Sequence, residues 1–219
     1  SGTDLRELNL ATLLRYYGVI MQKSEPFEDT LLGNLHFGVS HLDLPVPPSE
    51  LTGQDLTALQ DKGHLALQKA GLDVSTMPQG LFTNIGYKGT KLSGGQQQRL
   101  QIAGAHLKLA MSKNRPRLVI ADEPTSALDS LSEQTVMEHL HSSLPPRTTM
   151  FMVAHRLSTV EDMDRIIFVR PLQDCGEGVE QVTAHASLDE LYDKEELFRR
   201  MANAQKWTPK KLRQEVLVA

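Results

Sequence analysis

Two short stretches of the chain hold residues that could act on a phosphate-containing molecule. Residues 93–95 (Ser-Gly-Gly) form a glycine-rich turn before a predicted helix, and the unpaired N–H groups of a helix start can bind an anion. Asp122 and Glu123 are adjacent carboxylates that follow the apolar run 118–121. One carboxylate could hold a metal ion and the other could act as a base. A phosphate site joined by one helix to a metal or base site predicts nucleotide chemistry.

Polar side chains also follow two other apolar, strand-like runs. Gln22 comes after residues 16–21, and His155 comes after residues 149–154. In an open α/β sheet, ligands bind in the crevice beyond the carboxyl ends of the strands. We therefore expect both groups to meet the two carboxylates at one edge of a sheet, as a catalytic site requires. Because the run 118–121 is continuously apolar, we predict a strand that is buried on both faces, and we predict another buried strand at residues 149–154.

The residues around these sites predict two helices. Ser93 is the expected N-cap of the first helix, and His106 is expected away from its apolar face. That face consists of Leu100, Ala103, Leu107, Ala110 and Met111. Asp129 begins the second helix, in which Ser130 and Glu133 have the spacing of a capping box.

The composition is ordinary for a soluble globular protein, with 219 residues of which 40% are hydrophobic and 23% are charged. The formal net charge of −4 argues against general, electrostatic binding to nucleic acid. The single cysteine, Cys175, cannot form an internal disulfide, which favours a reducing compartment. No apolar run approaches the ~20 residues that a membrane-spanning helix needs, so we expect any membrane part to lie outside these residues.

Several motifs of this sequence together resemble one known family. Residues 92–96 (Leu-Ser-Gly-Gly-Gln) match the signature motif of ATP-binding cassette (ABC) ATPases letter for letter. Residues 118–123 resemble their Walker B strand with its catalytic glutamate, and residues 126–129 resemble their D-loop. Gln22 and the segment after it resemble the Q-loop of multidrug-type exporters, and residues 155–160 resemble their switch, or H-loop. The resemblance implies an α/β fold: a P-loop NTPase-like core with a mostly parallel sheet, plus an α-helical subdomain.

The resemblance also implies a division of the chain. Residues 1–22 would be part of the catalytic core, and residues 23–112 a helical subdomain with the signature motif. Residues 113–206 would be the rest of the core, with the Walker B strand, D-loop and H-loop, and residues 207–219 a C-terminal tail. The helical subdomain is longer than the family usually has, so we expect an exposed insertion at residues 39–51.

The reaction that the resemblance implies is ATP hydrolysis with Mg²⁺. Asp122 would hold the Mg²⁺, with help from Gln22, and Glu123 would be the general base. His155 would contact the γ-phosphate, and Gln22 would also help to place the attacking water. The ATP held by a second cassette would be bound by the signature motif and the D-loop, through Ser93, Gly94, Gly95, Gln96 and Asp129.

The implied partners are a second nucleotide-binding domain, in a head-to-tail dimer, and the transmembrane domain of the same or an associated chain. The implied location is the cytoplasmic face of a membrane, and no nucleic acid partner is expected. The 219 residues contain no Gly-x-x-x-x-Gly-Lys-Ser/Thr loop, the Walker A motif that normally wraps the phosphates. We therefore expect a domain truncated at its N-terminus, and an isolated chain that is inactive.

Two other functions remain open. One is a non-catalytic module of the same lineage that lacks the P-loop and contributes only its signature face to a partner cassette. The other is a soluble ABC ATPase without a role in transport. The retained Glu123 and His155 argue against the first, and the exporter-like residues 155–160 argue against the second. The coding sequence upstream of Ser1 would separate them, because transmembrane helices and a P-loop there would support the exporter.

Overall fold

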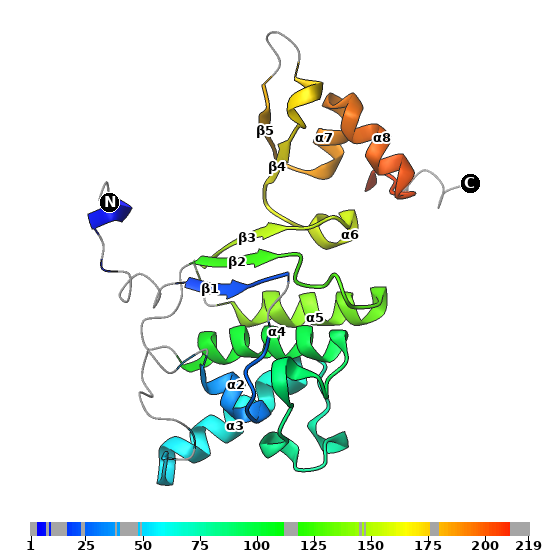
Figure 1. The fold of residues 1–219 in the computed structure, drawn as a ribbon. Coiled ribbons are helices and arrows are strands. Elements are labelled where there is room, and N and C mark those ends of the chain that lie inside the picture. Colours follow the sequence, from blue (N-terminus) through cyan, green and yellow to red (C-terminus); the bar gives the residue numbers. More distant parts are fainter. Residues whose placement is uncertain are drawn as a thin grey trace. The chain divides into compact units, whose positions relative to one another are not determined.

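The computed structural model describes residues 4–7, 9, 17–22, 25–37, 39, 48, 50–111, 118–144, 146, 148–175 and 180–210 (Figure 1). The chain divides into two compact units, Ser1–Val153 and Ala154–Ala219. The finer division into core, helical subdomain and tail stays a prediction. Most of the predicted insertion and most of the predicted tail lie outside the described residues.

Three parallel strands form the sheet of the first unit, in the order β1 (Tyr17–Ile20), β2 (Leu118–Asp122) and β3 (Thr149–Val153). Ile20 pairs with Ala121, which in turn pairs with Met152, so the carboxyl ends of the three strands lie side by side. Parallel neighbours need crossover connections, and the helices between these strands supply them. The prediction of an α/β fold with a parallel sheet is confirmed.

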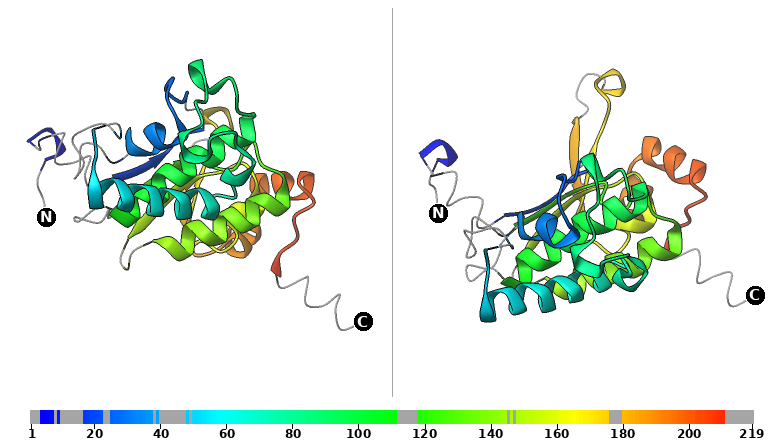
Figure 2. Two further views of the ribbon diagram at one scale, coloured as in Figure 1. Left: turned by 90° about the horizontal axis from the view of Figure 1, so that it is seen from below. Right: turned by 60° about the horizontal axis from the view of Figure 1, so that its bottom comes forward.

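Helices pack on one side of this sheet. They are α2 (Leu31–Phe37), α3 (Gly53–Lys69), α4 (Gly94–Met111) and α5 (Ser130–Ser143). Helix α4 contacts β1, and the other three helices pack on α4. Figure 1 shows α4 and α5 beneath the sheet, and Figure 2 shows α3, in cyan, alongside them. Short 3₁₀ helices occur at Leu5–Glu7, Val74–Thr76, Gly80–Phe82 and Tyr87–Gly89.

The two faces of the sheet differ in burial. Ile20 and Val119 lie on the face covered by helices and are fully buried. The alternate residues Val19, Phe151 and Val153 are 43%, 49% and 45% exposed, because successive strand residues point to opposite faces. The prediction that the second and third strands are buried on both faces is therefore wrong for this unit. Among its described residues, helices pack on one side only.

Helix α4 is buried on more sides than its sequence pattern predicted. Because α3, α5 and β1 surround it, five residues outside the predicted face are buried: Gln98, Ile102, Ala105, His106 and Leu109. Within the predicted face, Leu100, Ala103 and Leu107 are buried, but Ala110 is exposed. The prediction that His106 lies away from the core is wrong, since its side chain is only 3% exposed. Neither of its ring nitrogens has a hydrogen-bond partner among the described residues.

The second unit packs helices against an antiparallel pair of strands. Its elements are α6 (Leu157–Val160), β4 (Ile166–Val169), a 3₁₀ helix (Leu172–Asp174), β5 (Val182–His185), α7 (Leu188–Lys194) and α8 (Glu196–Ala204). The hydrophobic core includes Phe168 from β4 and Phe198 from α8. Trp207, which the sequence analysis assigned to the tail, is 8% exposed and packs edge-on against Phe198. The ordered core of this unit therefore extends beyond α8.

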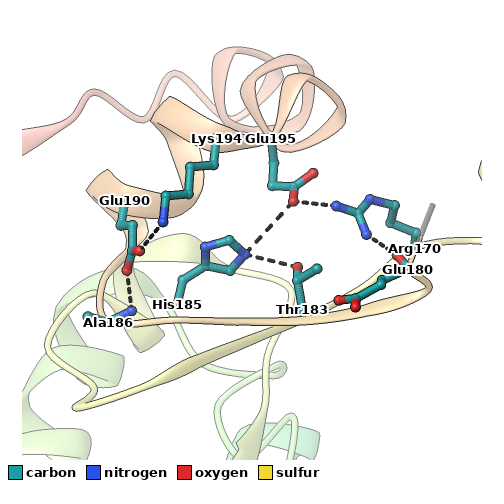
Figure 3. Close-up of polar contacts among 8 residues, drawn as sticks. All are labelled: Arg170, Glu180, Thr183, His185, Ala186, Glu190, Lys194 and Glu195. Carbon is teal, nitrogen blue, oxygen red and sulfur yellow. Dashed lines mark hydrogen bonds and ion pairs between the residues drawn. The ribbon is translucent and has the colours of Figure 1, made fainter. Parts of the chain in front are cut away.

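A buried ion pair joins the strands of the second unit to its helices (Figure 3). The guanidinium of Arg170, directly after β4, pairs with the carboxylate of Glu195 between α7 and α8, and the two side chains are 11% and 13% exposed. Arg170 also donates to the backbone carbonyl of Glu180. The Nε2 atom of His185 lies 3.9 Å from the Glu195 carboxylate and 2.9 Å from the Thr183 hydroxyl. The cluster thus connects both strands to the point where α7 meets α8.

Candidate functional site

Two predicted site residues from distant parts of the chain meet at the carboxyl edge of the sheet. The side-chain amide of Gln22, two residues after β1, donates a 2.7 Å hydrogen bond to Oε2 of Glu123, which directly follows β2. Asp122 is the last residue of β2 and is half-buried. The pairing of β1 with β2 aligns their ends, which explains the contact. Gln22 and Glu123 therefore meet at this edge of the sheet, as the strand ends predicted, and Asp122 is the neighbour of Glu123 in the chain. That Asp122 acts together with them stays a prediction.

Glu123 adopts an unusual backbone conformation, with a φ angle of 46°. The left-handed region costs a non-glycine residue about 1–3 kcal/mol, so surrounding bonds must hold it there. Its N–H donates to the carbonyl of Val153 at 2.8 Å, which links it to the end of β3. Its carbonyl accepts hydrogen bonds from the N–H of Ser126 and from Nε2 of Gln98, both at 3.2 Å. Glu123 is thus fixed from three directions.

Gln98 is a site residue that the sequence analysis missed. It lies in α4, one turn after the glycine pair, and is only 6% exposed. Its Nε2 donates to the carbonyl of Glu123 and to the hydroxyl of Ser126, and its Oε1 accepts from the N–H of Ala127 at 2.9 Å. Gln98 is the last of three consecutive glutamines and is followed by Arg99, so no sequence signal distinguishes it from its polar neighbours. Its burial depends on how α4 packs on the loop after β2.

The signature residues form the start of α4. Ser93 caps the helix by accepting a hydrogen bond from the N–H of Gln96 at 3.2 Å, and Gln96 Oε1 accepts one from the N–H of Ser93 at 2.8 Å. This reciprocal pair confirms Ser93 as the N-cap. Gly94 is exposed, and a Cβ at this position would meet no atom within 4 Å outside its chain neighbours and its own helix. A Cβ at Gly95 would lie 3.3 Å from the carbonyl oxygen of Ala127. The glycine turn therefore leaves open space at Gly94 and packs closely on the D-loop at Gly95.

Asp129 is the N-cap of α5, since its carboxylate accepts a 3.0 Å hydrogen bond from the N–H of Ser132. Hydrogen bonds from the side chain and backbone of Ser132 hold the pKa of the Asp129 carboxyl below its usual value. The predicted capping box of Ser130 and Glu133 is wrong. Glu133 is 4% exposed and accepts a 2.9 Å hydrogen bond from the hydroxyl of Thr125. It therefore helps to fix the loop between β2 and α5.

His155 belongs to the second unit, two residues beyond the end of β3. Its carbonyl accepts a 2.8 Å hydrogen bond from Nε2 of Gln205, whose Oε1 accepts one from the N–H of Leu157 at 3.3 Å. Gln205 thus fixes the backbone on both sides of the start of α6. That His155 meets Gln22 and Glu123 stays a prediction.

The residues at the edge of the sheet suit a magnesium ion accompanied by a nucleotide. No group of three or more His, Cys, Asp and Glu side chains that could hold a metal occurs among the described residues. Mg²⁺ in nucleotide sites is usually held by one or two carboxylates together with phosphate oxygens and waters. Asp122, which is half-buried, can supply such a carboxylate, and the side-chain oxygen of Gln22 is a second hard donor.

The family model described as "ABC transporter" matches residues 1–126. The chain is 38% identical over 187 residues to the "ABC-type transporter fsqE" of Aspergillus fumigatus, covering 84% of this chain and 13% of that protein. It is 39% identical over 168 residues to an "ATP-dependent lipid A-core flippase" of Francisella novicida, covering 76% of this chain and 25% of the flippase. It is 34% identical over 190 residues to the human "Iron-sulfur clusters transporter ABCB7, mitochondrial", covering 86% of this chain and 22% of that transporter.

A solved structure is similar over most of the chain. The structure of a bacterial Atm1-family ABC exporter with ATP bound matches with a TM-score of 0.70 and 28% identity, covering 94% of this chain and 31% of the exporter chain. The chain spans between 13% and 25% of the length of the three curated relatives. None of the helices within the described ranges is long and apolar enough to cross a membrane. The chain belongs to the ABC transporter family, as a nucleotide-binding domain related to those of ABCB-type exporters.

Proposed function

We propose that this chain hydrolyses ATP as part of an ABC exporter and couples the hydrolysis to transport across a membrane. The observation that carries the proposal is the 2.7 Å hydrogen bond between Gln22 and Glu123, which joins two separately recognised motifs at the carboxyl edge of the sheet. We propose the same partners as the resemblance implies. They are a second nucleotide-binding domain in a head-to-tail dimer, and a transmembrane domain at the cytoplasmic face of a membrane.

In the proposed reaction, Glu123 takes a proton from the water that attacks the γ-phosphate of the ATP on its own chain. Gln22 orients this water and the carboxylate that it already contacts. Asp122 would hold Mg²⁺, which neutralises charge on the phosphate oxygens when it is bound. His155 contacts the γ-phosphate. Phosphoryl transfer depends mainly on positioning and charge stabilisation, which fits a site built from separately anchored strand ends.

A second part of the proposal concerns the ATP of the partner cassette. We propose that it is bound by the signature motif and D-loop, through Ser93, Gly94, Gly95, Gln96 and Asp129. The exposed Gly94 supports this role, because an open helix start with no side chain in the way can receive a phosphate from outside the chain.

The half-exposed face of the sheet supports a third part of the proposal. Val19, Phe151 and Val153 expose apolar surface that a soluble core normally covers. We propose that a further segment covers this face and supplies the lysine and backbone N–H groups that wrap the phosphates. Residues 1–219 alone are then expected to bind Mg-ATP weakly and to hydrolyse none, which calorimetry and a phosphate-release assay on the folded chain would check. Micromolar binding would contradict this part.

Replacing Glu123 with glutamine in the full-length protein tests the proposed function. The amide keeps the size of the side chain but cannot accept the proton, so hydrolysis should fall by about 10²–10⁴-fold while ATP still binds. Glu138→Gln on the exposed face of α5 is the matched control and should keep parental turnover. Turnover of Glu123→Gln within a few fold of the parent would contradict the role of Glu123. A parent protein with no ATPase activity would instead favour the non-catalytic module.

A further inference from the structure

One side chain connects the signature helix to the backbone of the proposed base. Gln98 follows the glycine pair of α4 by one turn, and its amide makes three hydrogen bonds to the loop after β2. They reach the carbonyl of Glu123, the hydroxyl of Ser126 and the N–H of Ala127, at 3.2, 3.2 and 2.9 Å. Both ends of the amide are used, so the contact requires a side chain that donates and accepts at once.

The position of Glu123 makes this contact important. Its φ of 46° is a conformation that a glutamate does not hold unless neighbouring groups over-determine it. Its carbonyl accepts from the N–H of Ser126 and from Gln98. The Ser126 bond is local to the loop, whereas the Gln98 bond comes from another element. Gln98 therefore connects α4 directly to the backbone of Glu123.

The same helix start also touches the D-loop. A Cβ on Gly95 would lie 3.3 Å from the carbonyl oxygen of Ala127, whose N–H is bound by Gln98. Gly95 and Gln98, in adjacent turns of α4, thus both contact the loop after β2 at Ala127. The exposed end of α4, at Ser93 and Gly94, is therefore connected to the proposed base through part-buried contacts of the same helix.

We propose that Gln98 is a positioning residue that places Glu123 for catalysis and couples it to the signature end of α4. This inference rests on the proposed function, in which that end binds the ATP of the partner cassette while Glu123 acts on the ATP of its own chain. Through Gln98, the presence of ATP at the signature end of α4 then affects the position of Glu123, which acts on the ATP of its own chain. Interactions within one buried hydrogen-bond network are the physical basis of such coupling.

The first test is Gln98→Leu in the full-length protein. Leucine has a similar size but removes all three hydrogen bonds, so phosphate release in a single turnover should slow by roughly tenfold to a hundredfold, while ATP affinity is unchanged. Gln97→Leu is the matched control. It alters the neighbouring residue of the same helix, whose amide bonds the carbonyl of Gly89 at 2.9 Å and not Glu123. The control should keep the parental rate. Equal rates for Gln98→Leu and the parent would overturn the proposal.

Gln98→Glu keeps the proposal testable if the leucine variant does not fold. The carboxylate can still accept from the N–H of Ala127 but cannot donate to the carbonyl of Glu123. Its phosphate release should therefore slow as well, with thermal unfolding confirming that it is folded. A folded Gln98→Glu protein with the parental rate would overturn the proposal.

Mixed dimers decide through which site Gln98 acts. One chain carries Glu123→Gln, so that hydrolysis occurs only at the Glu123 of the other chain. Gln98→Leu should slow the single turnover when it is placed in the chain with the intact Glu123, and should have no effect in the other chain. Slowing only from the chain that carries Glu123→Gln would mean that Gln98 acts through the signature face and not on Glu123, which overturns the proposal. If dimers with Glu123→Gln in both chains release phosphate at the parental rate, the proposed function itself fails.

Discussion

The side-chain amide of Gln22 donates a 2.7 Å hydrogen bond to the carboxylate of Glu123 across a sequence separation of 101 residues. Only the parallel pairing of β1 with β2 brings the two side chains together. Glu123 also has little freedom of its own, since it is held by its backbone bonds to Val153 and Ser126. The contact therefore aligns a proposed base before any substrate arrives.

Changing Gln22 in the full-length protein should reduce catalysis more than binding. Gln22→Leu removes the amide that orients Glu123, so turnover should fall roughly tenfold to a hundredfold with ATP affinity retained. Gln22→Glu should be worse, because it sets a second carboxylate against Glu123. ATPase and nucleotide-binding assays check both variants, with Gln134→Leu on the exposed face of α5 as control. If Gln22→Glu kept the parental turnover, the contact would have no catalytic role.

Substituting Gly94 should prevent ATP-driven dimer formation without affecting the folding of the chain. A Cβ at Gly94 meets no atom within 4 Å outside its chain neighbours and its own helix, and Gly94 is exposed. We therefore expect Gly94→Leu to leave thermal stability and the first ATP-binding event unchanged. It should abolish ATP-driven dimerisation, because the side chain occupies the space where we propose that the partner's ATP sits. Light scattering with and without ATP measures this. Gly94→Leu dimers as stable as the parent's would argue against a signature site that acts across the interface.

His106 should make the stability of the first unit depend on pH. Burial, with smaller contributions from the charges of Lys69 and His139, lowers the pKa of His106 from 6.5 to about 4. Above pH 6.5 the imidazole is neutral in both states and stability is unaffected. As pH falls from 6.5 towards 4, the unfolded chain takes up a proton that the folded chain does not, so stability is lost, by at most about 3 kcal/mol.

Denaturant unfolding of His106→Leu and the parent at several pH values checks this dependence. The variant should lose the part of the pH dependence that lies between pH 6.5 and 4. His64→Leu, at an exposed position of α3, is the control and should keep that part. The same pH dependence in the parent and in His106→Leu would show that His106 is not the group responsible.

The buried pair of Arg170 and Glu195 should behave as a unit in the second half of the chain. Replacing either residue with methionine leaves the other charge largely buried without its ion-pair partner, at a cost of about 3 kcal/mol. The double replacement should cost less than the two single costs added together. The pair Arg200 and Glu196 is a control, since both side chains are about 70% exposed and its removal should cost under about 1 kcal/mol. Chemical denaturation gives all these values, and additive single costs would refute the coupling.

The sequence allowed the sheet and part of the site to be predicted because both depend on local pattern. Short apolar runs followed by polar residues predicted that Gln22 and Glu123 lie at one edge of the sheet, because the ends of parallel strands are aligned. The burial of His106 and the three bonds of Gln98 could not be predicted this way. They depend on which elements pack around α4, and periodicity within a helix shows only one preferred face.

The rules for helix capping predicted the N-cap correctly at α4, where the sequence offers one candidate residue. They predicted the capping box wrongly at α5, where two candidate residues are adjacent. Ser93 capped α4 as predicted. At α5, Asp129 and Ser130 are both good N-cap residues, and the structure uses Asp129. Glu133 accepts a hydrogen bond from the buried hydroxyl of Thr125, a contact that its spacing from Ser130 does not predict. The half-exposed face of the sheet was not predicted for a similar reason. The sequence of an apolar strand does not show whether another segment covers both of its faces or only one.

The left-handed backbone at Glu123 has a consequence for how this site can evolve. Glycine adopts that conformation without strain, and asparagine tolerates it better than glutamate does. Selection for thermal stability alone would therefore replace the very residue that the proposed reaction needs. Persistence of glutamate here across a lineage would mean that activity, and not folding, sets the identity of this position. Replacement by glycine at this position would indicate a descendant that has kept the fold and lost the hydrolytic activity.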